Sequence, residues 1–170
     1  MSNVALLVDL VLVFIVAPFD DARARGSILA APASKVVLTA RTDKKRYASD
    51  EAVLLSVDVK NDDAGPVTIW VRGIWPNHRI SVRDEDGHEA ELTRDGASIM
   101  RAFEDRMKGA GKNFPVVIVP GQSYKTINEV DLRKYFKLRK GRYKITVRYT
   151  EEQRPTPRDI ESNSMSIRIE

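Results

Sequence analysis

The stretch Gly141-Arg142-Tyr143-Lys144-Ile145-Thr146-Val147-Arg148-Tyr149 alternates strictly between two kinds of residue. Apolar and aromatic residues occupy every second position from Tyr143 to Tyr149, and polar or basic residues occupy the positions between them. This period of two is typical of a β-strand that buries one face and exposes the other to solvent. The stretch therefore predicts a strand whose outward side is basic.

The entry into this strand carries a second signal. A Gly-x-Tyr motif, here Gly141 to Tyr143, opens the strand about twenty residues after Pro120-Gly121-Gln122. A tyrosine at the start of the sixth strand is typical of the tyrosine corner of immunoglobulin-like sandwiches, where its hydroxyl bonds to backbone a few residues upstream. We expect Tyr143 to be buried, with its hydroxyl bonded to backbone within 132–138.

The rest of the chain also reads as short strands divided by turn-forming residues. Val53, Leu55, Val57 and Val59 alternate with polar or less buried positions, and the cluster from Asn61 to Pro66 forces a turn. Regular short strands without helices between them argue for antiparallel sheets. The sequence predicts an all-β, antiparallel immunoglobulin-like Greek-key sandwich over residues 35–170, with strands at 36–42, 53–60, 67–72, 80–83, 89–92, 116–119, 124–130, 141–149 and 165–169.

One segment has helical instead of strand spacing. Apolar side chains recur every three to four residues within 97–108, which predicts one short helical insert there, covering an open end of the sandwich. Asp95 or Ser98 is available as the residue that caps its start, and Gly109 as its stop. A second helical turn is expected around Leu132 to Phe136.

The N-terminal segment decides the expected compartment. Residues 4–17 form a 14-residue run that is apolar except for Asp9, which fits the core of a signal peptide and is shorter than a membrane span. Small-x-small sites predict cleavage after Ala24, giving a signal peptide at 1–24, or as late as Ala33. Asp9 and the lack of a preceding Lys or Arg favour the alternatives, a buried strand or an uncleaved anchor. We expect a periplasmic or extracellular protein without a stable transmembrane span after processing.

Catalytic and metal-binding signals are sparse. The chain has no cysteine, and His78 and His88 do not have the spacing of metal ligands. A Gly-x-Ser-x-Gly motif and a glycine-rich phosphate loop are also missing from the sequence. The acidic segment from Asp84 to Glu89 resembles part of a calcium loop, but the twelve-residue spacing is not met, and a hairpin turn explains it equally well. We expect no enzymatic activity, no cofactor and no metal.

Positive charge is concentrated late in the chain. Eight basic residues lie between Arg133 and Arg148 with no acidic residue among them, in a chain of net charge +4. Removing residues 1–24 takes away one basic and three acidic residues, so the net charge rises to +6. The stretch is either a solvated outer face, a surface for an anionic ligand, or, least in favour, a nucleic-acid site. The candidate anionic-ligand residues are Arg139, Lys140, Arg142, Lys144 and Arg148.

Two tryptophans flank Gly73. Trp70 lies on a predicted strand, where we expect it in the core, although an inward set of Val67, Ile69 and Val71 would place it outside. Trp75 lies in a predicted turn and is the candidate recognition aromatic.

Residues 53–149 resemble the immunoglobulin-like domain of the BsuPI-type proteinase-inhibitor family. The resemblance implies the same sandwich fold and raises proteinase inhibition as a function. Its motifs are turn and core residues, so no inhibitory residue is carried over to this chain, which differs by its export signal and longer helical insert. The matching landmarks are Val57 to Asn61, Ile80 to Asp84 with Asp86-Gly87, Phe103, Val119 to Ser123 and Gly141 to Tyr143.

Three functions remain open at this point. The first is a non-enzymatic exported domain that binds a protein or an envelope polymer. The second is a proteinase inhibitor acting through an exposed loop within 93–115 or 74–79. The third is binding of an anionic polymer through the basic face at 133–148. Neither the partner nor the oligomeric state follows from the sequence.

Overall fold

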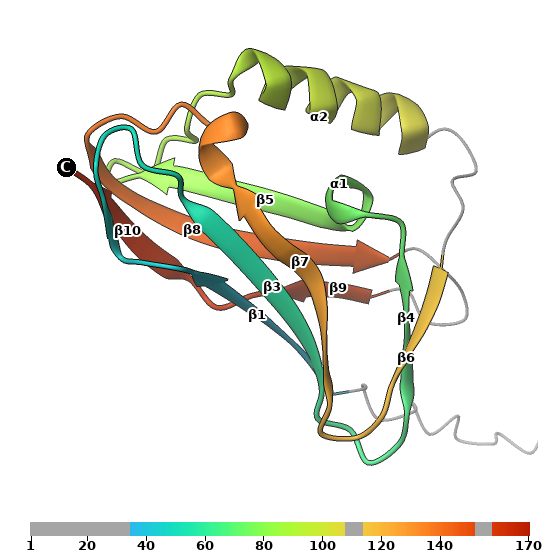
Figure 1. Cartoon of the computed structure of the whole chain (residues 1–170). Coiled ribbons are helices and arrows are strands. Elements are labelled where there is room, and N and C mark those ends of the chain that lie inside the picture. Colours follow the sequence, from blue (N-terminus) through green and yellow to red (C-terminus); the bar gives the residue numbers. More distant parts are fainter. Residues whose placement is uncertain (1–34, 108–113, 152–157) are drawn as a thin grey trace, which may run out of the picture. The chain divides into compact units, whose positions relative to one another are not determined.

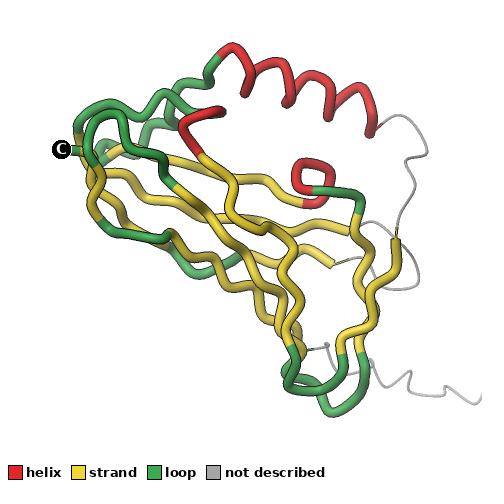
Figure 2. Tube along the Cα trace, viewed as in Figure 1, coloured by secondary structure: helices red, strands yellow, loops and turns green. Residues whose placement is uncertain are grey.

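The computed structural model describes residues 35–107, 114–151 and 158–170. Most of this part of the chain is strand (Figure 2). The expected signal peptide, both cleavage sites and Gly109 lie outside the described residues, so those expectations stay predictions.

Two sheets, antiparallel except for the short strand β2, face each other across the core (Figure 1). The first has the order β1-β3-β7, built from β1 (Val36–Thr42), β3 (Leu54–Asn61) and β7 (Ser123–Asp131). The second has the order β2-β10-β8-β5, built from β2 (Arg46–Tyr47), β10 (Met165–Ile169), β8 (Gly141–Glu151) and β5 (His78–Asp84). The short β9 (Arg158–Glu161) pairs with the end of β8, and β2 runs parallel to β10.

This connectivity is that of an immunoglobulin-like sandwich. Strands β5 and β8 pair in one sheet, whereas β7, which lies between them in the sequence, pairs with β3 in the other. The chain therefore crosses between the sheets instead of forming successive hairpins, as Greek-key sandwiches do. The predicted fold class is confirmed.

The core is filled by the residues whose alternation predicted it. Val53, Leu55, Val57 and Val59 are completely buried, and every second residue of β8 from Tyr143 to Tyr149 is at most 8% exposed. Burying Val, Leu and Ile side chains contributes about 1.5–3 kcal/mol each, so these two alternating runs supply a substantial share of the driving force for folding.

The tyrosine corner is also present. Tyr143 is 8% exposed, and the backbone N–H of Arg139 donates to its hydroxyl at 2.9 Å. The bonded residue lies one position beyond the expected range of 132–138. The bond joins the start of β8 to the turn before it, which positions the basic residues that follow.

A two-stranded ribbon extends from the sandwich. It consists of β4 (Val67–Val71) and β6 (Phe114–Ile118), which continue from the ends of β3 and β7 (Figure 1). The buried Glu151 carboxylate holds this ribbon in place, since it accepts from the Trp70 N–H at 2.8 Å and from the Tyr149 hydroxyl at 2.8 Å. Arg158 donates to the Thr68 carbonyl at 2.6 Å and pairs with Glu151. Burial and the Glu151 contact raise the pKa of Tyr149.

The helical insert, α2 (Arg94–Met107), begins three residues before the predicted start. Thr93 caps it, because the Thr93 Oγ1 accepts from the Gly96 N–H at 3.0 Å; Asp95 and Ser98 are therefore not the cap. Gly96 allows a close approach, since a Cβ there would lie 2.2 Å from the Tyr135 carbonyl oxygen. The helix contacts α1 (Ile74–Asn77) and lies over β5 in Figure 1.

Other local differences from the sequence prediction are small. The prediction of a strand at 89–92 is wrong. Glu89 makes an isolated β-bridge to Arg83, and Leu92 makes one to Phe136. Strands β2 and β9 and helix α1 are too short to produce a periodic signal, and none was predicted. The helical turn expected near residue 132 is confirmed as a 3-10 helix, η1 (Leu132–Lys134). Within the described ranges, neither α-helix is long and apolar enough to cross a membrane.

Candidate anion-binding face

The outward side of the second sheet is covered by basic side chains. On β8, the exposed residues Arg142, Lys144 and Arg148 alternate with the buried core residues. The neighbouring strands expose arginines by the same alternation, because the side chains between them are buried or face the core. We call this surface the basic face; it consists of Arg46, Arg79, Arg83, Arg142, Lys144, Arg148 and Arg168.

The strand register places these cations opposite one another. Arg168 pairs in register with Arg46 on one side and with Arg142 on the other. Strand β5 adds two more cross-strand pairs of like charge, Arg83 with Lys144 and Arg79 with Arg148. Like charges directly opposite in a sheet are destabilising, so sheet stability alone does not favour this arrangement.

Acidic residues neutralise only part of the face. Glu89 pairs with Arg83 at 3.0 Å, Glu161 with Arg148 at 3.3 Å, and Glu170 with Arg46 at 3.7 Å. In the described part of the chain, four cations on the face have no ion-pair partner: Arg79, Arg142, Lys144 and Arg168. The centre of the face therefore carries uncompensated positive charge.

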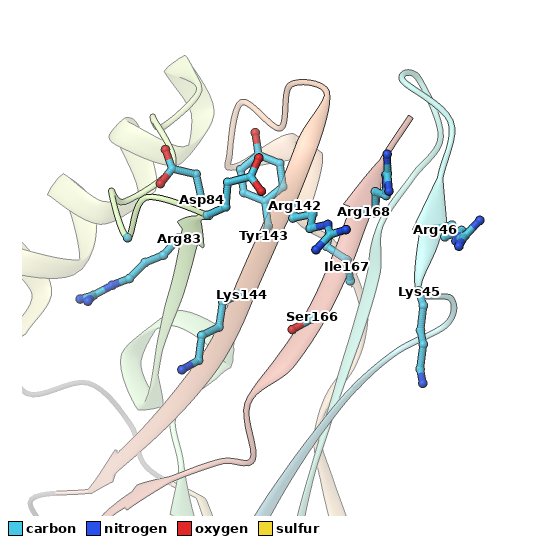
Figure 3. Close-up of a pocket in the computed structure, with 12 residues that line it drawn as sticks. Lys45, Arg46, Arg83, Asp84, Arg142, Tyr143, Lys144, Ser166, Ile167 and Arg168 are labelled. Atoms are coloured by element: carbon cyan, nitrogen blue, oxygen red, sulfur yellow. The ribbon is translucent and has the colours of Figure 1, made fainter.

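Two adjoining hollows follow the face. The first has a volume of about 670 Å³ and lies between β2 and β5; Figure 3 shows Arg142, Lys144 and Arg168 along its floor. The second, of about 400 Å³, continues toward Arg79 and shares Arg83 and Lys144 with the first. Ser81 and Thr146 add hydroxyl groups to the second hollow. The two hollows form an open trough in which guanidinium, ammonium and hydroxyl donors outnumber the carboxylates of Asp84, Glu85, Glu89 and Glu161. An excess of such donors suits an extended anion.

The five residues predicted from the sequence divide into two groups. Arg142, Lys144 and Arg148 lie on the basic face. Arg139 and Lys140 are exposed in the turn before β8, and Arg139 approaches Glu91 at 3.6 Å, away from the two hollows. The structure therefore brings three of the five together.

Arg133, at the start of the basic stretch, has a structural role. Its side chain donates to the backbone carbonyls of Glu51, Leu138 and Ala48 at 2.6, 3.0 and 3.1 Å. These bonds tie η1 to the loop before β3. The number of basic residues in this stretch of the sequence is therefore larger than the number of basic side chains that a ligand could contact.

Sequence reasoning missed the arginines of the face that come from other strands, Arg46, Arg79, Arg83 and Arg168. The signal was present in two of these strands, since the arginines of β5 and β10 alternate with Ile80, Val82, Ile167 and Ile169. Only the pairing of the strands shows that they share one surface with β8.

The tryptophans differ from expectation. Val67 and Ile69 are the buried residues of β4, so the core placement of Trp70 is wrong, and its half-buried side chain lies on the other side of that strand. Trp75 packs against the core from α1, with its ring 4.6 Å from that of Tyr135 in an edge-on arrangement. Trp75 remains half-buried and lines a smaller pocket beside the basic face.

The two histidines are in different environments. His78 is 4% exposed, with Nδ1 2.8 Å from the Ile74 carbonyl oxygen and Nε2 2.9 Å from the Thr126 hydroxyl. Because a carbonyl only accepts, Nδ1 carries the proton and Nε2 accepts from Thr126 in the neutral ring. Burial lowers the pKa of His78 to about 4, so the ring is uncharged at neutral pH.

His88 lies in the acidic turn with Asp84 and Asp86, whose potential metal-ligand atoms are within 4.8 Å of one another. One Asp84 oxygen accepts from the backbone N–H groups of Asp86 and His88 at 3.1 and 2.9 Å. These bonds are those of a carboxylate that stabilises a tight turn, which accounts for the cluster.

No protein-family model matches the sequence, and no curated protein matches it. Among solved structures, the chain is similar to the CARDB domain of a Pyrococcus furiosus protein, crystallised in complex with di-metal ions. The two are 12% identical, with a TM-score of 0.41 over 80% of this chain and 93% of the other. A solution structure of the same domain gives 12% identity and a TM-score of 0.38 over 79% and 93% of the two chains. The resemblance to the BsuPI-type family is not confirmed.

Proposed function

We propose that this protein is a non-enzymatic binding domain that acts after export and holds an anionic macromolecule on its basic face. The observation that carries the proposal is the row Arg46, Arg168 and Arg142, three arginine residues in register on three adjacent strands. An anion laid across this row would replace repulsion among the cations with attraction. Export rests on the N-terminal apolar run of the sequence.

A face that served only solvation would have a different charge pattern. Surfaces that serve solubility intersperse both signs, and cross-strand pairs there tend to be of opposite charge. The other sheet has such pairs, since Asp58 lies opposite Lys125 in register and pairs with Arg41. The basic face also has neighbours of opposite charge, Arg148 with Glu161 and Arg83 with Glu89. Its row of three arginines has no counterpart among the described residues of the other sheet, and this difference favours a binding role.

The described residues also bear on proteinase inhibition and on catalysis. The segment 74–79, one candidate inhibitory loop, forms α1 and the start of β5, with Asn77 and His78 only 4% exposed. It does not present an extended loop to a protease. The other candidate loop, 93–115, contains α2 and the start of β6, and its residues 108–113 lie outside the described residues, so inhibition through that loop stays a prediction. His78 is held by its bonds to Ile74 and Thr126, and the lack of enzymatic activity stays a prediction.

Retention of the full chain on a heparin-like resin tests the proposal. We expect binding at low salt that falls steeply as salt is added, because contacts with a polyanion release its bound cations. The triple variant Arg142→Gln, Lys144→Gln, Arg168→Gln should elute at much lower salt.

The matched control removes the same number of charges elsewhere. Lys35, Lys125 and Lys134 are exposed and lie off the basic face, so their replacement by Gln should leave retention nearly unchanged. Equal losses in the two triple variants would mean that only net charge matters. Lack of retention of the unmodified protein at low salt would refute an anion-binding function.

A further inference from the structure

A third hollow lies at the far end of the basic face, and it is apolar. Its volume is about 190 Å³, and its lining includes Trp75, Leu92, Met100, Tyr135 and Phe136, contributed by α1, α2 and the segments that flank β5 and η1. The edge-on pair of Trp75 and Tyr135 forms part of its wall. An aromatic-lined pocket of this kind is typical of the site that receives a single anchoring side chain in a protein interface.

The apolar pocket is continuous with the basic face. Arg79, Ser81 and Glu89 line both this pocket and the neighbouring basic hollow, and that hollow shares Arg83 and Lys144 with the largest one. A ligand lying along the face would therefore pass from guanidinium groups at one end to aromatic rings at the other. Its chemistry should change from anionic to apolar along its length.

We propose that the partner is a protein, bound through an extended acidic segment that ends in one large apolar side chain. This inference rests on the proposed function, since it names the partner of the same face. Acidic side chains would pair with the free cations Arg142, Lys144 and Arg168, and the terminal apolar side chain would fill the pocket beside Trp75.

Size favours a single side chain as the occupant of the pocket. Sites for whole small ligands usually enclose about 300–1,000 Å³, and the pocket offers about 190 Å³. This volume suits a leucine, methionine or phenylalanine side chain and is small for the acyl chain of a lipid. A polysaccharide offers C–H faces of its sugar rings and no large apolar side chain that would fill the pocket.

The length of the segment follows from sheet geometry. Arg168 on β10 lies opposite Arg142 on β8, and Arg79 on β5 lies opposite Arg148, six residues further along β8. Arg79 is therefore two strands and six residues away from Arg168. Two strand spacings of about 4.8 Å and six residues at about 3.3 Å give a diagonal of roughly 22 Å. An extended chain covers this distance in about seven residues.

The test uses a fluorescent peptide of one phenylalanine followed by six glutamates, titrated with the full chain at low salt. A second peptide replaces the phenylalanine by alanine, and a third replaces the glutamates by glutamines. We expect the first to bind roughly ten- to a hundredfold more tightly than the second, because one buried aromatic side chain contributes about that much. The third should bind at least as weakly as the second.

A pair of variants on α2 locates the anchor. Met100→Glu places a carboxylate in the pocket and should remove the advantage of the phenylalanine peptide. Ser98→Glu adds the same charge on the same helix at an exposed position that does not line the pocket, and should change affinity less than threefold. Unchanged circular dichroism and thermal melting would show that both variants fold.

The possible outcomes separate this inference from the proposed function. Equal binding of the phenylalanine and alanine peptides, unaffected by Met100→Glu, would overturn the inference and leave anion binding standing. Retention of the protein on the heparin-like resin without binding of any peptide would have the same consequence. Competition by vesicles of anionic phospholipid that is stronger than by the phenylalanine peptide would identify a membrane surface instead. Failure of resin and peptides together would overturn both proposals.

Discussion

Replacing Arg168 by glutamine should make the protein more stable. Arg168 is exposed on β10, lies in register between Arg46 and Arg142, and has no ion-pair partner among the described residues. Removing its charge relieves two repulsive contacts and sacrifices no attractive one. A surface arginine kept only for solubility or stability would not behave in this way.

The expected gain follows from Coulomb's law. The Cα atoms of directly opposite residues lie roughly 5–6 Å apart, and two unit charges at this separation repel by about 0.7 kcal/mol in water before screening. This value is an upper bound for each pair, because long side chains can move their charges apart and Glu170 partly neutralises Arg46. At 20 mM salt, screening over this distance is slight, and two pairs give a gain of about 1 kcal/mol. At 500 mM salt the screening length is roughly 4 Å, which reduces the gain to about 0.3 kcal/mol.

Urea unfolding followed by tryptophan fluorescence, at both salt concentrations, measures the effect. The control is Lys125→Gln, which also removes one positive charge but lies opposite Asp58 in register. That substitution should leave the free energy of unfolding unchanged or lower it slightly. If Arg168→Gln instead destabilises the protein at low salt, or matches the control, the cross-strand cations are not in mutual repulsion and the argument for a binding face loses its basis.

Three further predictions concern the framework that supports the face. Tyr143→Phe should cost about 1–2 kcal/mol in the free energy of unfolding, because the Arg139 N–H loses its acceptor; an unchanged urea midpoint would contradict the corner. Gly96→Ala should destabilise by about 2 kcal/mol or more, since its Cβ would meet the Tyr135 carbonyl oxygen, while Ala97→Gly, in the same turn of α2, should cost only about 1 kcal/mol. The folded-state pKa of His78, about 4, is below the unfolded value of 6.5, so its contribution to stability is present above pH 6.5 and is lost as pH falls toward 4. Over this pH range the free energy of unfolding of the wild type should fall by about 3 kcal/mol more than that of His78→Gln. Parallel curves of stability against pH for the two proteins would refute the shift.

The sandwich could be predicted because its evidence is local. The alternation from Val53 to Val59 and from Tyr143 to Tyr149 is a property of single strands. The turn residues between strands can also be recognised from the sequence without knowledge of the fold. The start of α2 was missed for the opposite reason. Gly96, in the first turn of that helix, lies against the backbone of Tyr135, a contact that no sequence pattern indicates.

The candidate site was predictable only in part for the same reason. Arg142, Lys144 and Arg148 stand out because they are close in the sequence. Arg46 and Arg168 join them only through strand pairing, which depends on register across more than a hundred residues.

Trp70 shows a second limit of local evidence. One face of β4 carries Val67 and Ile69, and the other carries Trp70, so burying either face would bury apolar side chains. In the assembled protein Val67 and Ile69 pack in the core. A strand with apolar residues on both faces does not reveal from its own sequence which face is inside.

The central claim is that anions bind on the outer face of the second sheet. Its most direct test is to map the backbone amide shifts of the full, isotopically labelled chain during titration with a short heparin fragment at low salt. The account predicts that the shifts concentrate on β5, β8 and β10, around Arg83, Lys144 and Arg168, and disappear at high salt. Shifts concentrated on β1, β3 and β7, or no shifts at a saturating concentration of the fragment, would contradict it.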